Sequence, residues 1–417
     1  MRRFKPFLRR TFITLLLCVT TVIWALLVVD TVGLARQAVA RPPEPTPTTT
    51  ATPTSLTQTE QFAAPTVLPE TTPVTELDGQ NLHPKTGRYI AAWLPDSFGS
   101  INRESFEANA DILDEVSPFW YSPDASGNLL HGSDARDETL LELARSKGVL
   151  MIPSIHNVLN TDPVSVILQN PEVRSRHVQN IVDEVLTYNY DGIDIDYEGL
   201  DSSLREEFSA FIVELSAALR EHNKMLTIAV HAKTCDNCGL GGFQDWSVIG
   251  PEVDRLRIMT YDYHWRGGGP GPVAPVYWVR DVAEYARTVV DPAKVIIGVP
   301  FYGYNWPLGG GRALGQTWDM IDAQIQARGL TVNLMESDSQ QRLVQENWIT
   351  YDGREVWFST SSGLRAKIEL VQELDLAGIA IWRLGGEDPK NWEVIRNQLV
   401  EDPFESQRML NQVLPEH

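Results

Sequence analysis

The sequence predicts a (β/α)8 barrel with a small α+β insertion after its seventh strand, and two observations support that fold class. Short runs rich in β-branched and aromatic residues alternate with segments of helical periodicity from residue 87 to about residue 400. Eight such runs occur, which is the number of strands in this kind of barrel. The length of 417 residues also allows two or three smaller domains. The regular alternation favours one barrel over an open doubly wound sheet.

Each expected barrel strand is short and bounded by turn or helix signals. The eight are Gly87–Leu94, Val116–Tyr121, Val149–Ile155, Gly192–Glu198, Leu226–His231, Leu256–Asp262, Val295–Phe301 and Gly378–Arg383. Clear helical periodicity occurs at Leu204–Arg220 and Val279–Val290. The connection after the seventh strand is too long for a loop. It contains a helix candidate, Trp318–Arg328, and three strand-like pieces: Leu330–Leu334, Trp348–Tyr351 and Glu355–Phe358.

The chain ahead of the barrel predicts export. Five basic residues precede an apolar run, Thr11–Val29, whose length as a helix is roughly 28 Å and close to that of a bilayer core. The basic flank predicts a cytoplasmic N-terminus. Ala38-Val39-Ala40 has the small-x-small form of a signal-peptidase site. The segment is therefore either a signal anchor that spans the membrane or a signal peptide cleaved after Ala40, and in both cases the rest of the chain is exported.

Four segments follow from these patterns. Residues 1–40 form the basic stub with the anchor or signal peptide, and residues 41–86 form a linker. The stretch 41–77 holds eight prolines and twelve threonines with few large apolar side chains, so it cannot bury enough surface to fold. The barrel occupies residues 87–402, with its insertion at about 307–358, and residues 403–417 form a tail.

Charge and cysteine content exclude several functions. The net charge is −20, and residues 1–40 hold six basic residues against one acidic, so the remainder carries −25. Such an acidic body repels a phosphate backbone, which excludes nucleic acid as a partner. Three cysteines provide neither a disulfide framework nor the spacing of a zinc site, so we expect no metal.

The candidate catalytic residues lie in the fourth expected strand. Side chains alternate across a strand, so Asp194, Asp196 and Glu198 share one face while Ile193 and Ile195 share the other. In a barrel the carboxylates line the interior and lead to the carboxyl-terminal mouth, where active sites lie. Carboxylates stacked this closely favour a shared proton, which raises the pKa of at least one of them. A general acid at neutral pH needs such a pKa. A strand with one solvated face is the alternative.

The run Asp-x-x-Asp-x-Asp-x-Glu, filled by Asp191, Asp194, Asp196 and Glu198, resembles the signature of glycoside hydrolase family 18, the chitinase family. The resemblance extends from about residue 87 to residue 400. Further matching pieces are Met259-Thr-Tyr261-Asp262, Gly298-Val-Pro-Phe-Tyr302-Gly and Trp382. A bacterial branch of spore-cortex and cell-wall hydrolases is most similar, through Ala232-Lys-Thr, Tyr261-Asp-Tyr-His-Trp265, Gly271-Pro-Val-Ala-Pro275 and Trp382-Arg-Leu-Gly385.

The resemblance implies a substrate-assisted, retaining hydrolase of β-1,4 linkages after N-acetylglucosamine, acting on peptidoglycan or chitin oligomers without a cofactor. It implies that Glu198 is the acid, that Asp196 orients the acetamide, that Asp194 holds Asp196, and that Tyr261 donates to the acetamide oxygen. The remaining residues implied to bind substrate are Asp262, Met259, Tyr302, Trp382 and Trp93. The alternative function is a non-catalytic, chitolectin-like surface protein, which the presence of Glu198 disfavours.

Three features depart from the family pattern. The third expected strand ends Pro153-Ser-Ile-His-Asn157, where chitinases commonly carry Ser-x-Gly-Gly, and Tyr304 replaces the arginine that often follows the Tyr-Gly of strand seven. Cys235-Asp-Asn-Cys238 follows strand five and is a candidate local disulfide. We expect His231, at the end of strand five, to be a satisfied polar residue. The expected location is the cell surface or extracellular space, either anchored by the N-terminal helix or secreted.

Overall fold

The computed structural model describes residues 84–85, 87–95 and 100–400. The predicted anchor or signal peptide, nearly all of the linker and the tail 403–417 lie outside the described residues, so their boundaries remain predictions. No helix in the described part of the chain has both the length and the apolar composition needed to cross a bilayer.

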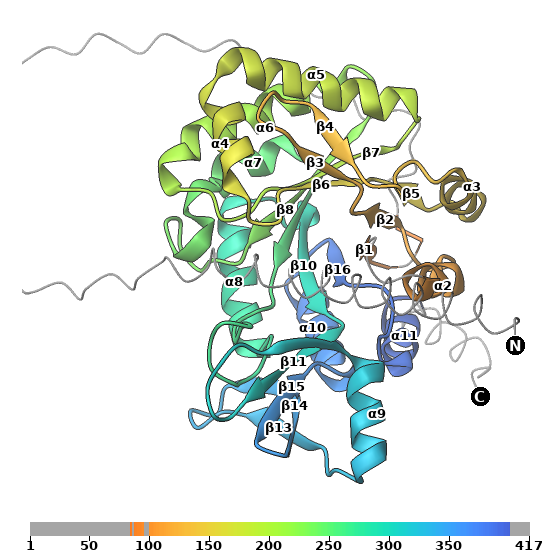
Figure 1. Ribbon diagram of the computed structural model, residues 1–417, viewed down its shortest axis with the longest axis vertical. Coiled ribbons are helices and arrows are strands. Elements are labelled where there is room, and N and C mark those ends of the chain that lie inside the picture. Colours follow the sequence, from red (N-terminus) through yellow and green to blue (C-terminus); the bar gives the residue numbers. More distant parts are fainter. Residues whose placement is uncertain (1–83, 86, 96–99, 401–417) are drawn as a thin grey trace, which may run out of the picture. The chain divides into compact units, whose positions relative to one another are not determined.

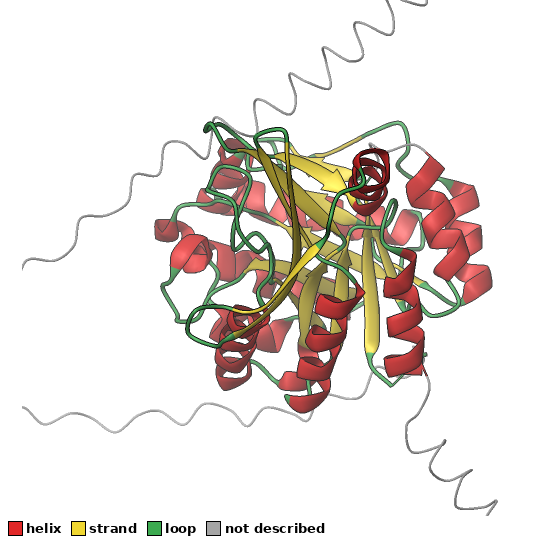
Figure 2. Ribbon diagram, turned by 90° about the horizontal axis from the view of Figure 1, so that it is seen from below, coloured by secondary structure: helices red, strands yellow, loops and turns green. Residues whose placement is uncertain are grey.

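An eleven-stranded sheet forms the barrel, and helices surround it (Figure 2). Its strands are β1 (Tyr89–Leu94), β2 (Glu115–Pro118), β3 (Tyr121–Pro123), β4 (Leu129–His131), β5 (Leu150–Met151), β6 (Ser154–His156), β7 (Gly192–Asp196), β8 (Met225–His231), β9 (Arg255–Met259), β10 (Val295–Pro300) and β16 (Gly378–Trp382). The hydrogen-bonded order is β4-β3-β6-β7-β8-β9-β10-β16-β1-β2-β5.

The ring closes through two interrupted strands. β2 and β3 are two parts of the second barrel strand, and β5 and β6 are two parts of the third. β2 pairs with β5, and β3 pairs with β6, in parallel register. The sequence predicts each as one continuous strand, and the structure corrects this. Pro118 and Pro153 lie at the breaks, and a proline has no N–H with which to continue the ladder.

The helices follow their strands along the chain (Figure 1). They are α2 (Ser100–Asn109), α3 (Glu138–Lys147), α4 (Thr161–Gln169), α5 (Pro171–Thr187), α6 (Arg205–Arg220), α7 (Trp246–Glu252), α8 (Val276–Val289), α10 (Ser361–Glu373) and α11 (Pro389–Ile395). The apolar core lies mainly between these helices and the outer face of the sheet. Ile193 and Ile195 belong to this outer core, as the alternation of strand four predicts.

The barrel interior is a separate cluster. Tyr89, Ala91 and Trp93 of β1 point into it, whereas the alternating residues Ile90 and Ala92 point to the helices. The interior also holds fully buried polar side chains, among them Glu115, Asp194 and Arg257. The most important of these is Asp194, which is fully buried.

The insertion after β10 is a five-stranded antiparallel sheet with one helix (Figure 1). It contains β11 (Tyr302–Pro307), β12 (Leu314–Thr317), α9 (Trp318–Arg328), β13 (Asn333–Ser337), β14 (Leu343–Tyr351) and β15 (Arg354–Phe358). The predicted helix is found at its predicted bounds. The inserted sheet begins at Tyr302 rather than near 307, because the Phe301 N–H still bonds to the barrel strand at Trp382 while Gly303 already pairs with Gln316 and Phe358.

Candidate active site

Asp194 is held from several sides in the barrel interior. Its Oδ2 accepts hydrogen bonds from Trp93 Nε1 at 3.0 Å and Ser154 Oγ at 2.7 Å, and its Oδ1 accepts one from Thr227 Oγ1 at 2.8 Å. An Arg257 guanidinium nitrogen lies 3.5 Å from Oδ2. Burial raises the pKa of Asp194, and the three hydrogen bonds oppose that rise. Both carboxylate oxygens are therefore already occupied.

Asp196 differs sharply from Asp194, although both are buried. Its Oδ1 is buried and has no hydrogen-bond partner among the described residues. Burial, followed by the negative charges of Glu198 and Asp194, raises the pKa of Asp196 well above its usual range. With donors around Asp194 and an unpartnered oxygen on Asp196, a proton shared within this group is best held on Asp196. Its unpartnered oxygen can accept a hydrogen bond from a ligand.

Glu198 follows the end of β7 and is the carboxylate of this series that reaches solvent, with 22% of its side chain exposed. Asn157 fixes its backbone: Asn157 Oδ1 accepts the Glu198 N–H at 2.9 Å, and Asn157 Nδ2 donates to the Glu198 carbonyl at 2.9 Å. His231 Nε2 accepts the Gly199 N–H at 3.2 Å and lies 3.9 Å from Glu198 Oε2. Because that nitrogen accepts, the neutral imidazole carries its proton on Nδ1.

Tyr261 lies after β9, two strands along the barrel from Glu198. Burial, then the charges of Asp196 and Glu198, raises its pKa well above the usual range, so its hydroxyl remains a donor. Gly298 makes space for the ring, because a Cβ there would lie 2.8 Å from Tyr261 Cε1 and 2.7 Å from the Ile258 carbonyl oxygen. The position of Tyr261 therefore depends on the absence of a side chain on β10.

Asp262 is bound by two tyrosines of the inserted sheet. The Tyr302 hydroxyl donates to Asp262 Oδ1, and the Tyr304 hydroxyl lies 3.0 Å from each carboxylate oxygen. Asp262 has a φ of 62°, a left-handed conformation that aspartate adopts more readily than most residues. Tyr304, which stands where the family often has an arginine, therefore binds Asp262. Met259, at the end of β9, is half-buried and pairs in register with His231.

Four aromatic rings contact one another near the mouth of the barrel. Trp382 lies with its ring centroid 5.8 Å from that of Trp93 and 5.0 Å from that of Phe119. Phe119 in turn stacks on His156 at 4.8 Å. Trp382 is half-buried, whereas Trp93 is only 1% exposed. The structure therefore gives Trp93 a supporting contact to Asp194 and leaves Trp382 as the more accessible ring.

The two candidate disulfide residues are joined. Cys235 and Cys238 form a disulfide with Cα atoms 5.3 Å apart, in the loop after β8. In the same loop Lys233 Nζ donates to the carbonyl oxygens of Asp236 at 2.9 Å and Gln244 at 2.6 Å. The loop is thus fixed by a covalent link and a buried cation. Within the residues the structure describes, no three His, Cys, Asp or Glu side chains come together as a metal site.

The sequence-based analysis assigned no role to Ser154, Thr227, Asn157, Gly298 or Phe119. Ser154 and Thr227 face Asp194 because both pair with it in register across β6, β7 and β8. Their signal in the sequence is a hydroxyl residue on the same strand face as a histidine, His156 in β6 and His231 in β8. Asn157, Gly298 and Phe119 have no comparable local signal, because each acts through a residue distant along the chain.

Buried carboxylates lead along β7 to the partly exposed Glu198 at the mouth of a (β/α)8 barrel, with Tyr261 two strands along and the accessible ring of Trp382. This is the arrangement expected of a glycoside hydrolase. The chain belongs to glycosyl hydrolases family 18, whose sequence pattern matches residues 116–387. It is 30% identical over 323 residues to the "Putative sporulation-specific glycosylase YdhD" of Bacillus subtilis, covering 74% of this chain and 76% of that protein.

Other relatives belong to the spore-cortex branch of the family. The cortical fragment-lytic enzyme of Bacillus anthracis is 29% identical over 254 residues, and the match covers 59% of each chain. The present chain thus spans little more than half of that enzyme. The crystal structure of the Bacillus cereus spore cortex-lytic enzyme SleL superposes with a TM-score of 0.68 at 23% identity, covering 75% of this chain and 74% of that chain. This similarity supports the barrel fold.

Proposed function

We propose that this hydrolase cleaves β-1,4 linkages after N-acetylglucosamine with retention of configuration, using the acetamide of the substrate as nucleophile. One observation carries the proposal: in the described part of the chain the buried Asp196 Oδ1 has no hydrogen-bond partner, and Asp196 lies two residues before the acid Glu198. An acetamide N–H would supply the missing hydrogen bond. The buried hydroxyl of Tyr261, kept protonated, can donate to the acetamide oxygen.

A residue can be assigned to each step of this hydrolysis. Glu198 protonates the glycosidic oxygen as the bond to the leaving sugar breaks. The acetamide carbonyl oxygen attacks the anomeric carbon, forming an oxazolinium ion whose N–H is held by Asp196. Glu198, now a carboxylate, removes a proton from a water molecule that opens the ring and restores the configuration. Two displacements at one carbon give net retention.

The contacts of Asp194 support the participation of the acetamide. A retaining enzyme of the common type needs a second carboxylate free to attack the anomeric carbon. Both oxygens of Asp194 already accept hydrogen bonds from Trp93, Ser154 and Thr227 in the barrel interior. Asp194 is therefore not free to attack the sugar, and its negative charge favours the protonated form of Asp196.

The stereochemistry of the first product tests this mechanism. Proton NMR during hydrolysis of a soluble β-1,4-linked N-acetylglucosamine tetramer should show the β-anomer first, followed by mutarotation. A thiazoline analogue of the oxazolinium ion should inhibit the enzyme. An α-anomeric initial product would exclude substrate assistance even if hydrolysis is fast.

We propose peptidoglycan or related short N-acetylglucosamine glycans as the natural substrates, because the relatives named above are cortex-lytic and sporulation enzymes. Purified peptidoglycan, soluble chitooligosaccharides and colloidal chitin should be compared side by side. We expect release from the first two and slow action on colloidal chitin. Rapid release from colloidal chitin with none from peptidoglycan would contradict this choice.

We further propose that the barrel acts outside the cytoplasm, attached by Thr11–Val29 or released after Ala40. The basic residues ahead of the apolar run support export, and the Cys235–Cys238 disulfide fits an oxidising compartment. The full-length protein should remain with membranes after a high-salt wash and release its barrel when the linker is cut by protease. A soluble mature form that begins at Arg41 would instead indicate cleavage.

A further inference from the structure

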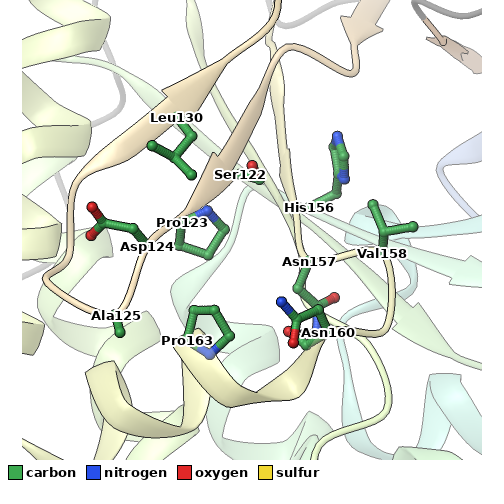
Figure 3. A pocket seen from close by; sticks show the side chains of 10 residues that line it. All are labelled: Ser122, Pro123, Asp124, Ala125, Leu130, His156, Asn157, Val158, Asn160 and Pro163. Carbon is green, nitrogen blue, oxygen red and sulfur yellow. Dashed lines mark hydrogen bonds between the residues drawn. The ribbon is translucent and has the colours of Figure 1, made fainter. Parts of the chain in front are cut away.

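A cavity of about 410 Å³ lies beside the active site, between the β3–β4 hairpin and the loop that joins β6 to α4 (Figure 3). This volume falls within the range of small-ligand sites. The hairpin contributes Pro123 and Leu130, and the loop and the start of α4 contribute Asn157, Val158, Asn160 and Pro163. None of these residues has a role in the mechanism proposed above, except that Asn157 also holds the backbone of Glu198.

The cavity lies on the side of the leaving sugar. Along the barrel, β6 and β9 lie on opposite sides of β7, the strand that leads to Glu198. Tyr261, which would hold the acetamide of the reacting sugar, follows β9. Asn157, which lines the cavity, follows β6 and bonds to Glu198. A glycosidic oxygen protonated by Glu198 therefore separates a reacting sugar on the Tyr261 side from a leaving sugar on the cavity side.

The walls of the cavity suit the amide and methyl groups of a ligand. Of its titratable lining groups, His156 has its pKa lowered to about 4 by burial and is neutral at pH 7. The Asp124 carboxylate is used by its own turn, where it accepts the backbone N–H groups of Ser126 and Asn128. No lysine or arginine lines the cavity among the described residues. Aliphatic side chains and the amides of Asn157 and Asn160 remain as contacts.

A second sugar ring fits these walls poorly. Pyranose faces stack on aromatic rings, and the imidazole of His156 is the single aromatic ring among the described lining residues. That ring is already stacked on Phe119. Methyl groups and peptide amides, in contrast, match a lining of proline, leucine, valine and asparagine.

The cavity is held in shape before any ligand binds. At the hairpin tip the Gly127 carbonyl oxygen accepts hydrogen bonds from His177 Nδ1 at 3.0 Å and Asn180 Nδ2 at 2.9 Å, both on α5. On the other wall the Asn160 N–H donates to the Asn157 carbonyl oxygen at 2.7 Å, which closes the turn that holds Val158 and Leu159 at φ values of 45° and 62°. Both walls are thus fixed, which reduces the cost of ordering them on binding.

We infer that this cavity binds a short peptide carried, through an amide, on the 3-O-lactyl group of the leaving sugar, as in N-acetylmuramic acid. The inference rests on the proposed hydrolysis of N-acetylglucosamine glycans and narrows it to peptide-substituted glycans. The reacting sugar would be N-acetylglucosamine, and the peptide would extend from the next sugar past Asn157 toward Pro163 and Leu130.

Defined substrates test this assignment. The peptide-bearing tetrasaccharide of N-acetylglucosamine and N-acetylmuramic acid is compared with the same glycan after removal of the peptide, and with N-acetylglucosamine tetramer. We expect a kcat/KM at least about tenfold higher with the peptide than without it, corresponding to about 1.4 kcal/mol. Equal rates on the two muramyl substrates would overturn the inference.

Variants at exposed positions locate the effect. Leu130 is 52% exposed, so Leu130→Trp should fold and fill the cavity, and Ala125→Trp fills it from the hairpin tip. Either variant should remove the preference for peptide and leave hydrolysis of N-acetylglucosamine tetramer unchanged. Leu308→Trp, at a position 54% exposed near the end of β11, is the matched control and should retain the preference. Loss of tetramer hydrolysis in the cavity variants would instead show that a sugar occupies the cavity.

A binding measurement separates this inference from the proposed function. N-acetylmuramyl-L-alanyl-D-isoglutamine has no glycosidic bond to cleave, so its affinity for the wild-type protein can be measured directly by NMR titration. It should bind at least about tenfold more tightly than N-acetylmuramic acid, and Leu130→Trp should abolish the difference. Failure of all glycan hydrolysis with intact peptide-dependent binding would reject only the function. Hydrolysis with no peptide-dependent binding would reject only the cavity assignment.

Discussion

The side chain of Asn157 binds both backbone polar groups of Glu198. Its oxygen accepts the Glu198 N–H at 2.9 Å, and its nitrogen donates to the Glu198 carbonyl at 2.9 Å. The two residues follow the neighbouring barrel strands β6 and β7, just beyond the last paired positions, His156 and Asp196. This contact fixes the direction in which the acid leaves its strand. It also connects the acid with the cavity on the side of the leaving sugar.

Replacing Asn157 should therefore lower catalysis more than binding. Asn157→Ala removes this partner from the partly buried N–H and carbonyl groups of Glu198, at a cost to the free energy of unfolding of about 1 kcal/mol each, the lower end for buried groups. We expect kcat on N-acetylglucosamine tetramer to fall about tenfold or more, since displacement of a catalytic group by about 1 Å has effects of this size. Asn180→Ala, which removes one hydrogen bond to the Gly127 carbonyl, is the control. A kcat reduced equally by both variants would assign Asn157 a purely structural role.

Gly298 should be intolerant of a side chain because of Tyr261. Gly298→Ala would place a Cβ 2.8 Å from the tyrosine ring and 2.7 Å from the Ile258 carbonyl oxygen, so the ring must move. We expect at least a tenfold loss of kcat/KM with a folded protein. Gly309→Ala adds the same methyl group in open space within the insertion and should have no effect. Equal activity of the two variants would show that the reaction does not depend on the position of Tyr261.

The raised pKa of Asp196 predicts a pH-dependent cost to stability. The folded protein holds a proton on Asp196 above pH 3.8, where an unfolded aspartate has begun to lose it. Folding stability from this group is therefore present at low pH and lost as pH rises from about 3.8 through the folded-state pKa. Asp196→Asn removes this dependence.

Thermal unfolding at pH 4, 5.5 and 7 should show that Asp196→Asn gains stability over wild type as pH rises, while losing activity. Asp322→Asn on α9 removes a surface carboxylate and serves as the control for net charge. A difference in Tm between Asp196→Asn and wild type that does not grow with pH would mean that Asp196 is not the protonated member of the series.

Much of the fold and of the acidic series could be predicted from local patterns. Alternation along Ile193 to Glu198 predicts that Asp194 faces inward and Ile195 outward, which the structure confirms. The breaks at Pro118 and Pro153 could have been predicted from the missing N–H of proline. The early start of the inserted sheet at Tyr302 could not, because it depends on pairing of Gly303 with Phe358, far along the chain.

The surroundings of the site were less predictable for the same reason. Tyr304 reaches Asp262 through a side-chain hydrogen bond from the insertion to the loop after β9, and nothing near Tyr304 in the sequence indicates it. The cavity beside Asn157 depends on how the tip of the β3–β4 hairpin docks on α5, through hydrogen bonds to the carbonyl oxygens of Ser126 and Gly127. Such contacts join residues tens of positions apart, where no periodicity or motif operates.

The central claim is that Glu198 alone supplies the proton that breaks the glycosidic bond, and the most direct measurement is the turnover of N-acetylglucosamine tetramer by Glu198→Gln. We expect kcat to fall at least about a hundredfold, the lower end for loss of a general acid, while tetramer binding measured by titration is retained. Glu206→Gln, on the exposed side of α6, should match wild type. Near-normal hydrolysis by Glu198→Gln would contradict the account.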